Sequence, residues 1–343
     1  MRFADNRNKI GKYIPAVVFL IFIYGMALWF IFSPKPDYSS SEKRYLQKFP
    51  EVTAEKLLSG DFGSEFETFF ADRFPQRNTW VGLNAYTALA EGNNGASGVY
   101  NCKNGYLINK PVSTENNLDK NIGAVADFAK SIDTPTTVML VPSTGYIVDD
   151  VLPTFHDKYN DDEDISKISS TLSKDKIGFV ALRERFKSEY KNGSQLYYKT
   201  DHHWTTKGAY TGYQELCKAL GITPIDDSTL KKDSYPDFYG TTYSSSGFWL
   251  TPPDNIEIWN NPKNSDRNIS VKITEGANIK TSGSMYFTDH LKEDDKYPVF
   301  IDGNHALTEI TNTNAKNGTI LLIKDSFSHS LAPFLAENYS KVV

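Results

Sequence analysis

The chain has 343 residues, of which 39% are hydrophobic, 23% charged and 13% aromatic. This length and composition predict a folded protein with one large domain or two modest ones, and the 20 Tyr and 21 Phe argue against disorder. The net charge of −5, without a cluster of basic residues, argues against a nucleic-acid partner. Cys102 and Cys217 lack metal-site spacing, and the sequence leaves open whether they form a disulfide.

The N-terminus carries an almost unbroken apolar run over residues 14–32, with no charged residue. A helix needs roughly 20 residues to cross the ~30 Å hydrocarbon layer of a membrane, and the run has that length. The positive charges of Arg2, Arg7, Lys9 and Lys12 precede it. The positive-inside rule therefore predicts a cytoplasmic N-terminus and an extracytoplasmic remainder.

A cleaved signal peptide is the alternative to an anchor. Its apolar region would be shorter, about 7–15 residues, and would end at a small-x-small site. The longer run here leads into Ser-Pro-Lys-Pro, which favours an uncleaved anchor in a single-pass membrane protein. The expected parts are a cytoplasmic N-terminus, a transmembrane anchor, a linker and one extracytoplasmic domain, over residues 1–13, 14–33, 34–41 and 42–343. Because the chain stops in what looks like the opening of a strand, we expect this domain to be truncated at its C-terminus.

Strand and helix patterns alternate along the remainder, which predicts an α/β fold with parallel strands. Asn104-Gly105 between short apolar segments predicts a hairpin over residues 98–108. We interpret the acidic run at 161–164 as a solvated loop and the irregular stretch at 233–264 as a loop covering a site. The other expected helices lie within 41–92 and at 118–132, 181–190, 206–220 and 328–338, and the other strands at 137–141, 195–198 and 320–323.

The first motif that could carry chemistry is Lys-Thr-Asp-His-His-Trp-Thr-Thr-Lys-Gly at residues 199–208. A strand precedes it and a helix follows, so it lies where open α/β sheets place their sites. Asp201 is close enough in sequence to hold His203 in one tautomer and to stabilise its imidazolium. Two alternatives remain open, a packed loop without chemistry and a metal site that His202, His305 or His329 could join.

The second motif is Lys324-Asp325-Ser326, between an apolar strand and a helix. A serine at such a junction presents its hydroxyl at the sheet edge, close to backbone N–H groups that can stabilise an oxyanion. Taken alone, Lys-Asp-Ser is a common tripeptide, and Ser326 is better explained as a helix cap. Together with His203 and Asp201, it completes a nucleophile, a base and an orienting carboxylate.

These motifs, with Asp302-Gly-Asn-His305, resemble the bacterial DHHW protein family, which looks related to the SGNH-hydrolase-like periplasmic proteins of alginate O-acetylation. The resemblance implies a three-layer sandwich with a mostly parallel central sheet. It assigns the catalytic roles to Asp201, His203 and Ser326, and an oxyanion or substrate-binding role to Asn304 and Gly303, although Gly303-Asn304 also makes a good turn. The sequence departs from the usual Gly-Asp-Ser by carrying Lys324.

The resemblance further implies a membrane-anchored O-acetyltransferase or O-acetylesterase that acts on a cell-envelope polysaccharide through an acyl-serine. A transferase outside the membrane would need a membrane-bound acyl-transfer partner. We find no Walker A motif and no G-x-G-x-x-G after a strand, so no cofactor is expected, and no metal. Two rival hypotheses remain: a non-catalytic glycan-binding or scaffold protein, and a metal-dependent phosphoesterase using Asp201, His202 and His203.

Overall fold

The computed structural model describes residues 2–112, 117–175 and 177–343, and the side chains among them from residue 12 onward. The chain divides after Leu83 into two compact units. The helix α4 (Arg77–Ala90) begins in the first unit and ends in the second. The site described below lies entirely in the second unit.

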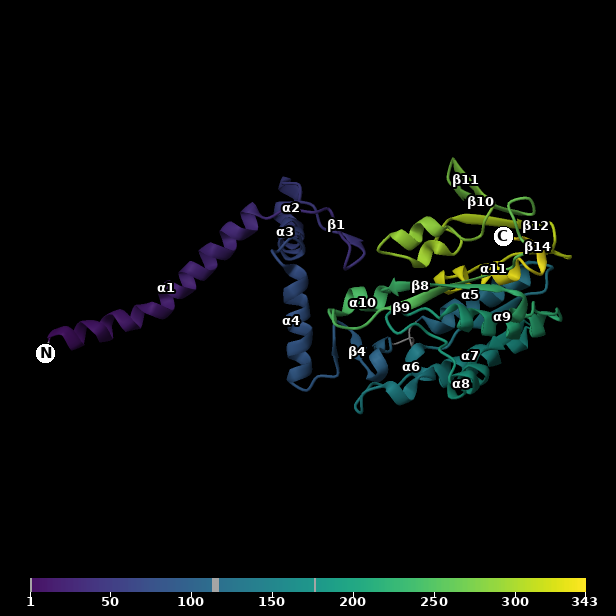
Figure 1. Cartoon of the computed structure of the whole chain (residues 1–343), viewed down its shortest axis with the longest axis horizontal. Coiled ribbons are helices and arrows are strands. Elements are labelled where there is room, and N and C mark those ends of the chain that lie inside the picture. The colour runs from purple at the N-terminus through teal and green to yellow at the C-terminus, as the bar shows by residue number, and fades with distance from the viewer. Residues whose placement is uncertain (1, 113–116, 176) are drawn as a thin grey trace. The chain divides into compact units, whose positions relative to one another are not determined.

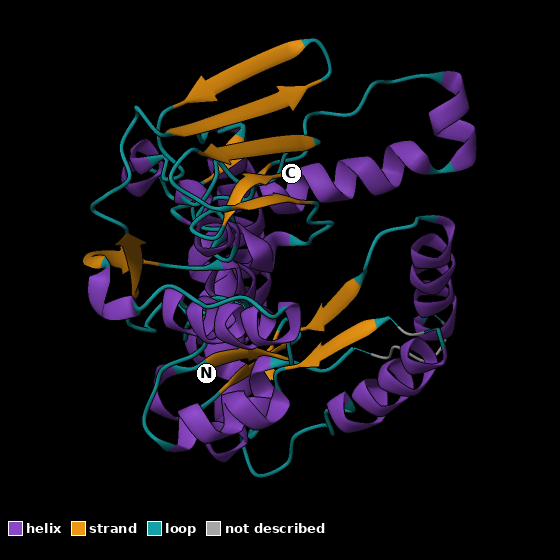
Figure 2. Ribbon diagram, turned by 90° about the vertical axis from the view of Figure 1, so that its right-hand side faces the viewer, coloured by secondary structure: helices purple, strands orange, loops and turns teal. Residues whose placement is uncertain are grey.

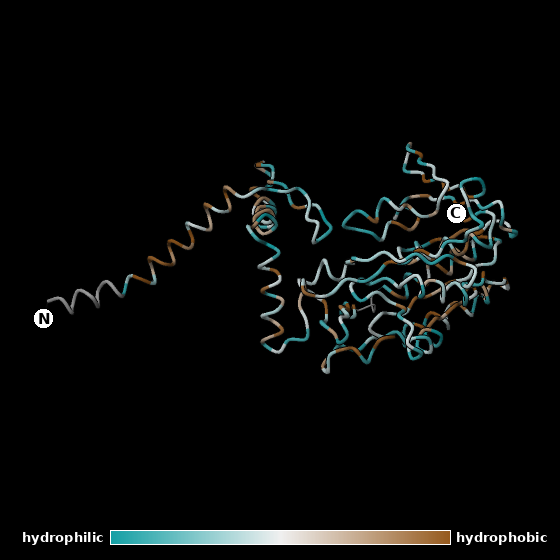
Figure 3. Tube along the Cα trace, viewed as in Figure 1, coloured by the Kyte–Doolittle hydropathy of each residue, from teal (hydrophilic) through white to brown (hydrophobic). Residues whose placement is uncertain are grey.

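The first unit begins with the long helix α1 (Arg2–Phe32). Its segment Lys12–Phe32 is long and apolar enough to cross a membrane, and none of its most apolar stretch is buried in the protein. Figure 3 shows this hydrophobic segment along α1. The structure therefore agrees with the expected apolar helix, while length and composition alone fit both an anchor and a signal sequence.

The rest of the first unit is built from short strands and helices around aromatic residues. Within the predicted helical region, Phe66 and Phe69 of the same helix both pack against the ring of Phe49. The buried guanidinium of Arg73 donates hydrogen bonds to backbone carbonyls, including that of Gln47 at 2.8 Å. The remaining elements of this unit are β1 (Tyr38–Ser39), β2 (Arg44–Tyr45), α2 (Ala54–Ser59) and α3 (Asp61–Asp72).

The second unit contains a five-stranded sheet with the order β11-β10-β12-β14-β13 and three smaller sheets. In Figures 1 and 2, β10, β11 and β12 run side by side in the larger sheet. Its strands are β10 (Ile269–Glu275), β11 (Asn278–Ser282), β12 (Leu307–Asn312), β13 (Asn317–Ile320) and β14 (Tyr339–Val342). The smaller sheets contain β3 (Gly95–Ala96), β4 (Val99–Asn101) and β5 (Leu107–Asn109); β6 (Thr137–Leu140) and β7 (Gly178–Ala181); and β8 (Lys231–Phe238) and β9 (Asp254–Asn260).

The expected mostly parallel central sheet is wrong for the strand pairs described. Only β6–β7 and β13–β14 are parallel, and the other pairs, including β10–β11, β10–β12 and β12–β14, are antiparallel. The length of the connections explains the antiparallel direction. A two-residue turn joins β10 to β11 and permits only an antiparallel pair, because a parallel pair needs a long crossover connection. The broader expectation of an α/β fold is confirmed.

Helices accompany the strands of the second unit. The strongest prediction, a helix over residues 206–220, matches α9 (Thr206–Leu220), and the hydroxyl of Thr205 caps it by accepting from the Gly208 N–H at 3.1 Å. The remaining α-helices are α5 (Leu118–Ser131), α6 (Thr144–Ile147), α7 (Asp161–Lys174), α8 (Arg183–Lys191), α10 (Thr241–Ser246) and α11 (Ala332–Leu335). The 3₁₀ turns are 103–105, 149–151, 227–229, 288–292, 297–299 and 326–329.

The predicted hairpin is present as the antiparallel pair β4–β5, in which Tyr100 lies opposite Ile108. Asn104 and Gly105 both have positive φ angles, 58° and 78°, which is why Asn-Gly suits this turn. Cys102, at the end of β4, and Cys217, in α9, are both free thiols buried in the same hydrophobic core. The possibility of a disulfide that the sequence left open is therefore not realised.

Two loop predictions are wrong. The acidic run at 161–164 is the first turn of α7, where carboxylates are stabilised by the positive end of the helix dipole. The stretch 233–264 is not a covering loop, because most of it forms the antiparallel pair β8–β9 with α10 between the strands. Both of its glycines, Gly240 and Gly247, lie in the connection between the strands, and this connection supports the site through Thr241 rather than covering it.

Candidate active site

Asp201, His203 and Ser326 lie in one hydrogen-bonded row. The Nδ1 atom of His203 lies 2.5 Å from Oδ1 of Asp201, and Nε2 of His203 lies 2.8 Å from the Ser326 hydroxyl. Since an ionised carboxylate only accepts hydrogen bonds, the proton of a neutral ring is on Nδ1 and its Nε2 lone pair faces the serine. Asp201 and His203 are buried, and Ser326 is half-buried. This arrangement allows His203 to take a proton from Ser326.

The second oxygen of Asp201 is held by the segment that begins α10. Oδ2 accepts from the backbone N–H of Thr241 at 2.7 Å and from its hydroxyl at 3.1 Å. Gly240 is needed for this approach, because a Cβ atom there would lie 2.1 Å from the Cβ of Asp201. Burial by itself raises the pKa of Asp201, but the hydrogen bond from His203 and the charges of His203 and His202 bring that pKa below its ordinary value.

The same region offers the donor set considered for a metal. Donor atoms of Asp201, His202 and His203 lie within 4.8 Å of one another. However, Oδ1 and Oδ2 of Asp201 each accept two hydrogen bonds, and Nδ1 of His202 bonds the hydroxyl of Thr241 at 2.7 Å. The Nε2 atom of His203 bonds Ser326. A metal ion would have to displace most of these contacts, so the donor set fits a hydrogen-bonded carboxylate–imidazole pair better than a metal centre.

A second carboxylate, Asp254 at the start of β9, supports the segment just before Asp201. Its Oδ2 accepts from the backbone N–H of Thr200 at 2.8 Å and from the Thr200 hydroxyl at 2.7 Å. Its Oδ1 accepts from the N–H of Lys199 at 3.0 Å and from the Gln195 amide at 3.1 Å. Burial raises the pKa of Asp254 despite these four bonds. The β8–β9 hairpin thus fixes the backbone that carries Asp201.

Trp204 joins the histidine segment to the serine segment. Its indole N–H is shared between the backbone carbonyl of Phe327, at 2.8 Å, and the hydroxyl of Ser330, at 2.9 Å. The ring is fully buried, and two glycines of α9 make room for it. A Cβ at Gly208 or Gly212 would lie 2.9 Å from an atom of the Trp204 side chain. The tryptophan therefore sets the spacing between the segments of His203 and Ser326.

Tyr297 lies between two imidazole rings. Its ring stacks on His203 with centroids 4.0 Å apart and planes 11° from parallel, and its centroid is 5.9 Å from that of His329. Its hydroxyl donates to the backbone carbonyl of Ser326 at 3.2 Å. Burial raises the pKa of Tyr297 well above its ordinary value, so the hydroxyl keeps its proton. Tyr297 thus contacts both the ring of His203 and the backbone of Ser326.

The structure connects Asn304 to the serine turn through His329. The Nε2 atom of the buried His329 lies 2.9 Å from Oδ1 of Asn304, and His329 ends the 3₁₀ turn that Ser326 begins. Burial and the positive charge of Lys324 lower the pKa of His329 to about 3, so its ring is neutral at ordinary pH. Because the neutral ring donates its one proton from Nε2, Nδ1 carries a lone pair, and this buried Nδ1 has no hydrogen-bond partner among the described residues. His329 already bonds Oδ1 of Asn304, so the side chain of Asn304 can bind a ligand only through its amide N–H groups.

The loop before Asn304 is strained and strongly braced. Ile301, Asp302 and Gly303 have consecutive positive φ angles of 50°, 66° and 84°, and a β-branched residue such as isoleucine rarely adopts this conformation. The Asp302 carboxylate accepts from Nζ of Lys280 at 2.7 Å and from Nε2 of His290 at 2.9 Å, and these bonds offset the strain. Gly303 is buried in this loop, directly before the exposed Asn304.

One possible oxyanion donor is already occupied. The backbone N–H after the nucleophile, that of Phe327, donates to Oδ1 of Asp325 at 3.0 Å. Asp325 therefore caps the serine turn, which is the role that the sequence alone would have allowed for Ser326. This leaves the amide of Asn304 as a side-chain candidate near the turn.

Several supporting residues were missed from the sequence: Gly240, Thr241, Asp254, Tyr297 and the role of His329. Their contacts join segments at least 25 positions apart, and no periodic pattern marks them. Trp204 alone had a signal, because it completes the Asp-His-His-Trp motif. The structure also brings His305 to Asp302 and Glu275 rather than to Asp201.

The model of the family described as "DHHW protein" matches residues 101–343. No curated protein matches the chain. A DHHW family protein from Eubacterium siraeum has 17% identity and a TM-score of 0.56, covering 72% of this chain and 82% of that one. Bacillus cereus PatB1 with a sulfonyl adduct has 20% identity and a TM-score of 0.57, covering 70% and 83%. The O-acetyltransferase domain of Pseudomonas putida AlgJ has 12% identity and a TM-score of 0.45, covering 71% and 78%. The family match covers well over half of the chain, which therefore belongs to the DHHW protein family.

Proposed function

We propose that this protein is a serine-dependent O-acetyltransferase or O-acetylesterase with an SGNH-hydrolase-like site, acting on a cell-envelope polysaccharide. The observation that carries the proposal is the continuous row from Asp201 through His203 to the Ser326 hydroxyl, with bonds of 2.5 and 2.8 Å. A neutral imidazole held by a carboxylate and facing a hydroxyl is the arrangement that nucleophilic acyl transfer requires.

In the first half-reaction, the Oγ atom of Ser326 attacks the acyl carbonyl while Nε2 of His203 takes its proton. The negative charge of Asp201 stabilises the imidazolium that forms, and the amide of Asn304 donates to the oxyanion. His203 then returns the proton to the leaving group, and an acyl-serine remains. In the second half-reaction, a sugar hydroxyl or water attacks the acyl-serine while Nε2 of His203 takes its proton. The bond between the acyl group and Oγ of Ser326 then breaks, and His203 returns the proton to that oxygen.

The apolar helix Lys12–Phe32 supports a location at the membrane, with the site on the extracytoplasmic side. In the proposed arrangement it is an uncleaved single-pass anchor, and residues 42–343 form the extracytoplasmic part. A transferase there requires an acyl donor delivered across the membrane, so the proposal includes a membrane-bound acyl-transfer partner.

The test is covalent labelling of the detergent-solubilised full chain with a fluorophosphonate and with a sulfonyl fluoride. The second reagent is chosen because PatB1, which shares the fold, forms a sulfonyl adduct. We expect a single adduct on Ser326, absent from Ser326→Ala and reduced at least 10³-fold in rate in His203→Ala. Ser328→Ala, two residues away, is the matched control and should label normally. A folded wild-type protein that remains unlabelled would refute the proposed chemistry.

A non-catalytic glycan-binding or scaffold protein is the second candidate, and Lys324 is the observation that favours it. Lys324 occupies the position of the glycine in the usual Gly-Asp-Ser motif. Burial lowers the pKa of its partly buried ammonium group. A cation next to the serine turn could bind a ligand without chemistry. Under this alternative, glycan binding would survive in Ser326→Ala and no reagent would label the wild-type protein.

A further inference from the structure

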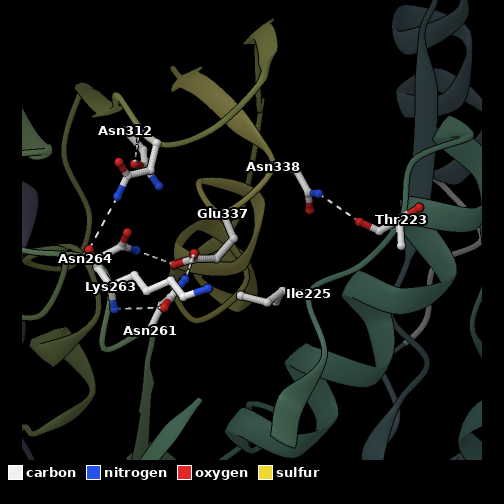
Figure 4. Close-up of a pocket in the computed structure, with 9 residues that line it drawn as sticks. Thr223, Ile225, Asn261, Lys263, Asn264, Asn312, Glu337 and Asn338 are labelled. Atoms are coloured by element: carbon white, nitrogen blue, oxygen red, sulfur yellow. Dashed lines mark hydrogen bonds between the residues drawn. The ribbon is translucent and has the colours of Figure 1, made fainter. Parts of the chain in front are cut away.

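A cavity of about 550 Å³ lies in the second unit, and none of its lining residues belongs to the Asp201–His203–Ser326 row. Figure 4 shows its polar side chains converging from several loops. The lining consists of five asparagines together with Glu337, Lys263, Thr223 and a single aliphatic residue, Ile225. This volume falls within the usual range for ligand sites, about 300–1,000 Å³, but the lining is far more polar than usual.

The cavity and Ser326 lie at opposite ends of the parallel pair β13–β14. Glu337 and Asn338 come just before β14, whose first residue, Tyr339, pairs with Asn317 at the start of β13. Ser326 follows the other end of β13. A ligand in this cavity is therefore not the group that reacts with Ser326.

Glu337 is the central group of the lining. Its Oε1 accepts from the amide of Asn264 at 2.6 Å and its Oε2 from the amide of Asn261 at 2.7 Å. Burial raises its pKa, and no ion pair to it exists among the described side chains. A carboxylate has about four acceptor positions, so two remain open here. A desolvated carboxylate with neutral partners and spare acceptor positions is suited to hydroxyl donors.

The amides around Glu337 are fixed before any ligand arrives. The Asn338 amide donates to the carbonyl of Thr223 at 2.9 Å, and the Asn312 amide donates to the carbonyl of Ala336 at 2.8 Å. Each bond uses one of the two N–H groups of its amide, so the other is free to donate. Figure 4 shows the Lys263 side chain extending toward the same space. Fixed side chains lower the entropy cost of binding.

We propose that this cavity binds one or two neutral sugar units of a glycan. Sugar hydroxyls both donate and accept, so vicinal hydroxyls can donate to Glu337 while amide N–H groups and the ammonium of Lys263 donate to sugar oxygens. Glu337 and Lys263 give the lining one negative and one positive group, so its charge favours neither an anionic nor a cationic ligand, and an apolar ligand finds only Ile225. The inference deepens the proposed function by giving the glycan a second point of attachment, but it does not depend on acyl transfer.

The test is isothermal titration of the detergent-solubilised full chain with neutral di- to tetrasaccharides built from hexoses or N-acetylhexosamines. Oligouronates and glucosamine oligomers serve as the anionic and cationic probes. We expect one class of site for a neutral oligosaccharide, with affinity at least tenfold lower in Glu337→Gln and in Asn264→Ala. The exposed Glu184→Gln is the matched control, and thermal melting verifies that each variant is folded.

Ser326→Ala separates this inference from the proposed function, because it should retain the full affinity whether or not the protein is an enzyme. Three results would each overturn the inference: no binding of any neutral oligosaccharide, unchanged affinity in both cavity variants, or preference for a charged probe.

Discussion

The two halves of the site are supported in different ways. On the Asp201 side, both carboxylate oxygens are fully used by nearby groups, and the β8–β9 hairpin fixes the backbone through Asp254. On the Ser326 side, the serine turn depends on the Trp204 indole and the Tyr297 hydroxyl, while Nδ1 of His329 lacks a partner and residues 301–303 are strained. The comparison shows that more hydrogen bonds hold the Asp201 half in place than the Ser326 half.

Among the residues that support the two halves, the largest effect is expected from a change of Asn304 on the Ser326 side. Asn304→Ala removes the proposed oxyanion donor and should lower the acylation rate by about 10²–10³-fold, since one such donor is worth this much in a comparable site. Asn304→Asp keeps the oxygen that His329 bonds but replaces the N–H donors with negative charge, so it should be at least as slow. Labelling kinetics measure both. The exposed Asn278→Ala is the control, and wild-type rates in both Asn304 variants would rule out the oxyanion role.

Gly240→Ala breaks the Asp201 half instead. The added Cβ would overlap the Asp201 side chain, so the backbone must move or the carboxylate must turn away from His203. Overpacking of this kind costs about 1–3 kcal/mol of unfolding free energy. Denaturant titration measures the loss, and labelling of Ser326 should slow in parallel. Gly123→Ala, which has open space around its Cβ, should not be destabilised, and equal stability of the two variants would contradict this account.

Trp204→Phe tests the link between the halves. Phenylalanine keeps the aromatic bulk but leaves the Phe327 carbonyl and the Ser330 hydroxyl without the indole N–H. We expect a loss of about 1–2 kcal/mol in unfolding free energy, typical of unsatisfied buried acceptors. Denaturant titration gives this value. Trp80→Phe, in the first unit, is the matched control, and a Trp204 variant as stable as that control would show that the link is unimportant.

The last prediction concerns how the stability of the fold changes with pH at His329. Its pKa is lowered from 6.5 to about 3 in the folded protein, so between these values the unfolded state binds one more proton. Unfolding free energy should therefore fall as pH falls from 6.5, by at most about 1.4 kcal/mol per pH unit from this group. His329→Gln should show a shallower fall in denaturant titrations between pH 7.5 and 5, whereas the exposed His156→Gln should not. Identical slopes for wild type and His329→Gln would contradict the burial of a neutral ring.

The sequence by itself determined the local features of this protein. Apolar runs and caps placed α9, the β4–β5 hairpin and the long apolar helix, because these depend on periodicity and on residues such as Asn104-Gly105. The order Asp201, His203, Ser326 was also visible, since each residue lies in a short motif at the end of an element. The DHHW family followed from the same motifs.

Only the tertiary structure decided how distant segments meet. The strand directions of the five-stranded sheet, the Gly240 approach to Asp201 and the Tyr297 ring between two imidazoles depend on packing between segments that share no local pattern. The acidic start of α7 and the β8–β9 hairpin were misread for the same reason. The composition of a segment shows how polar it is. Whether its backbone forms hydrogen bonds with another segment depends on how the two pack together in the folded protein.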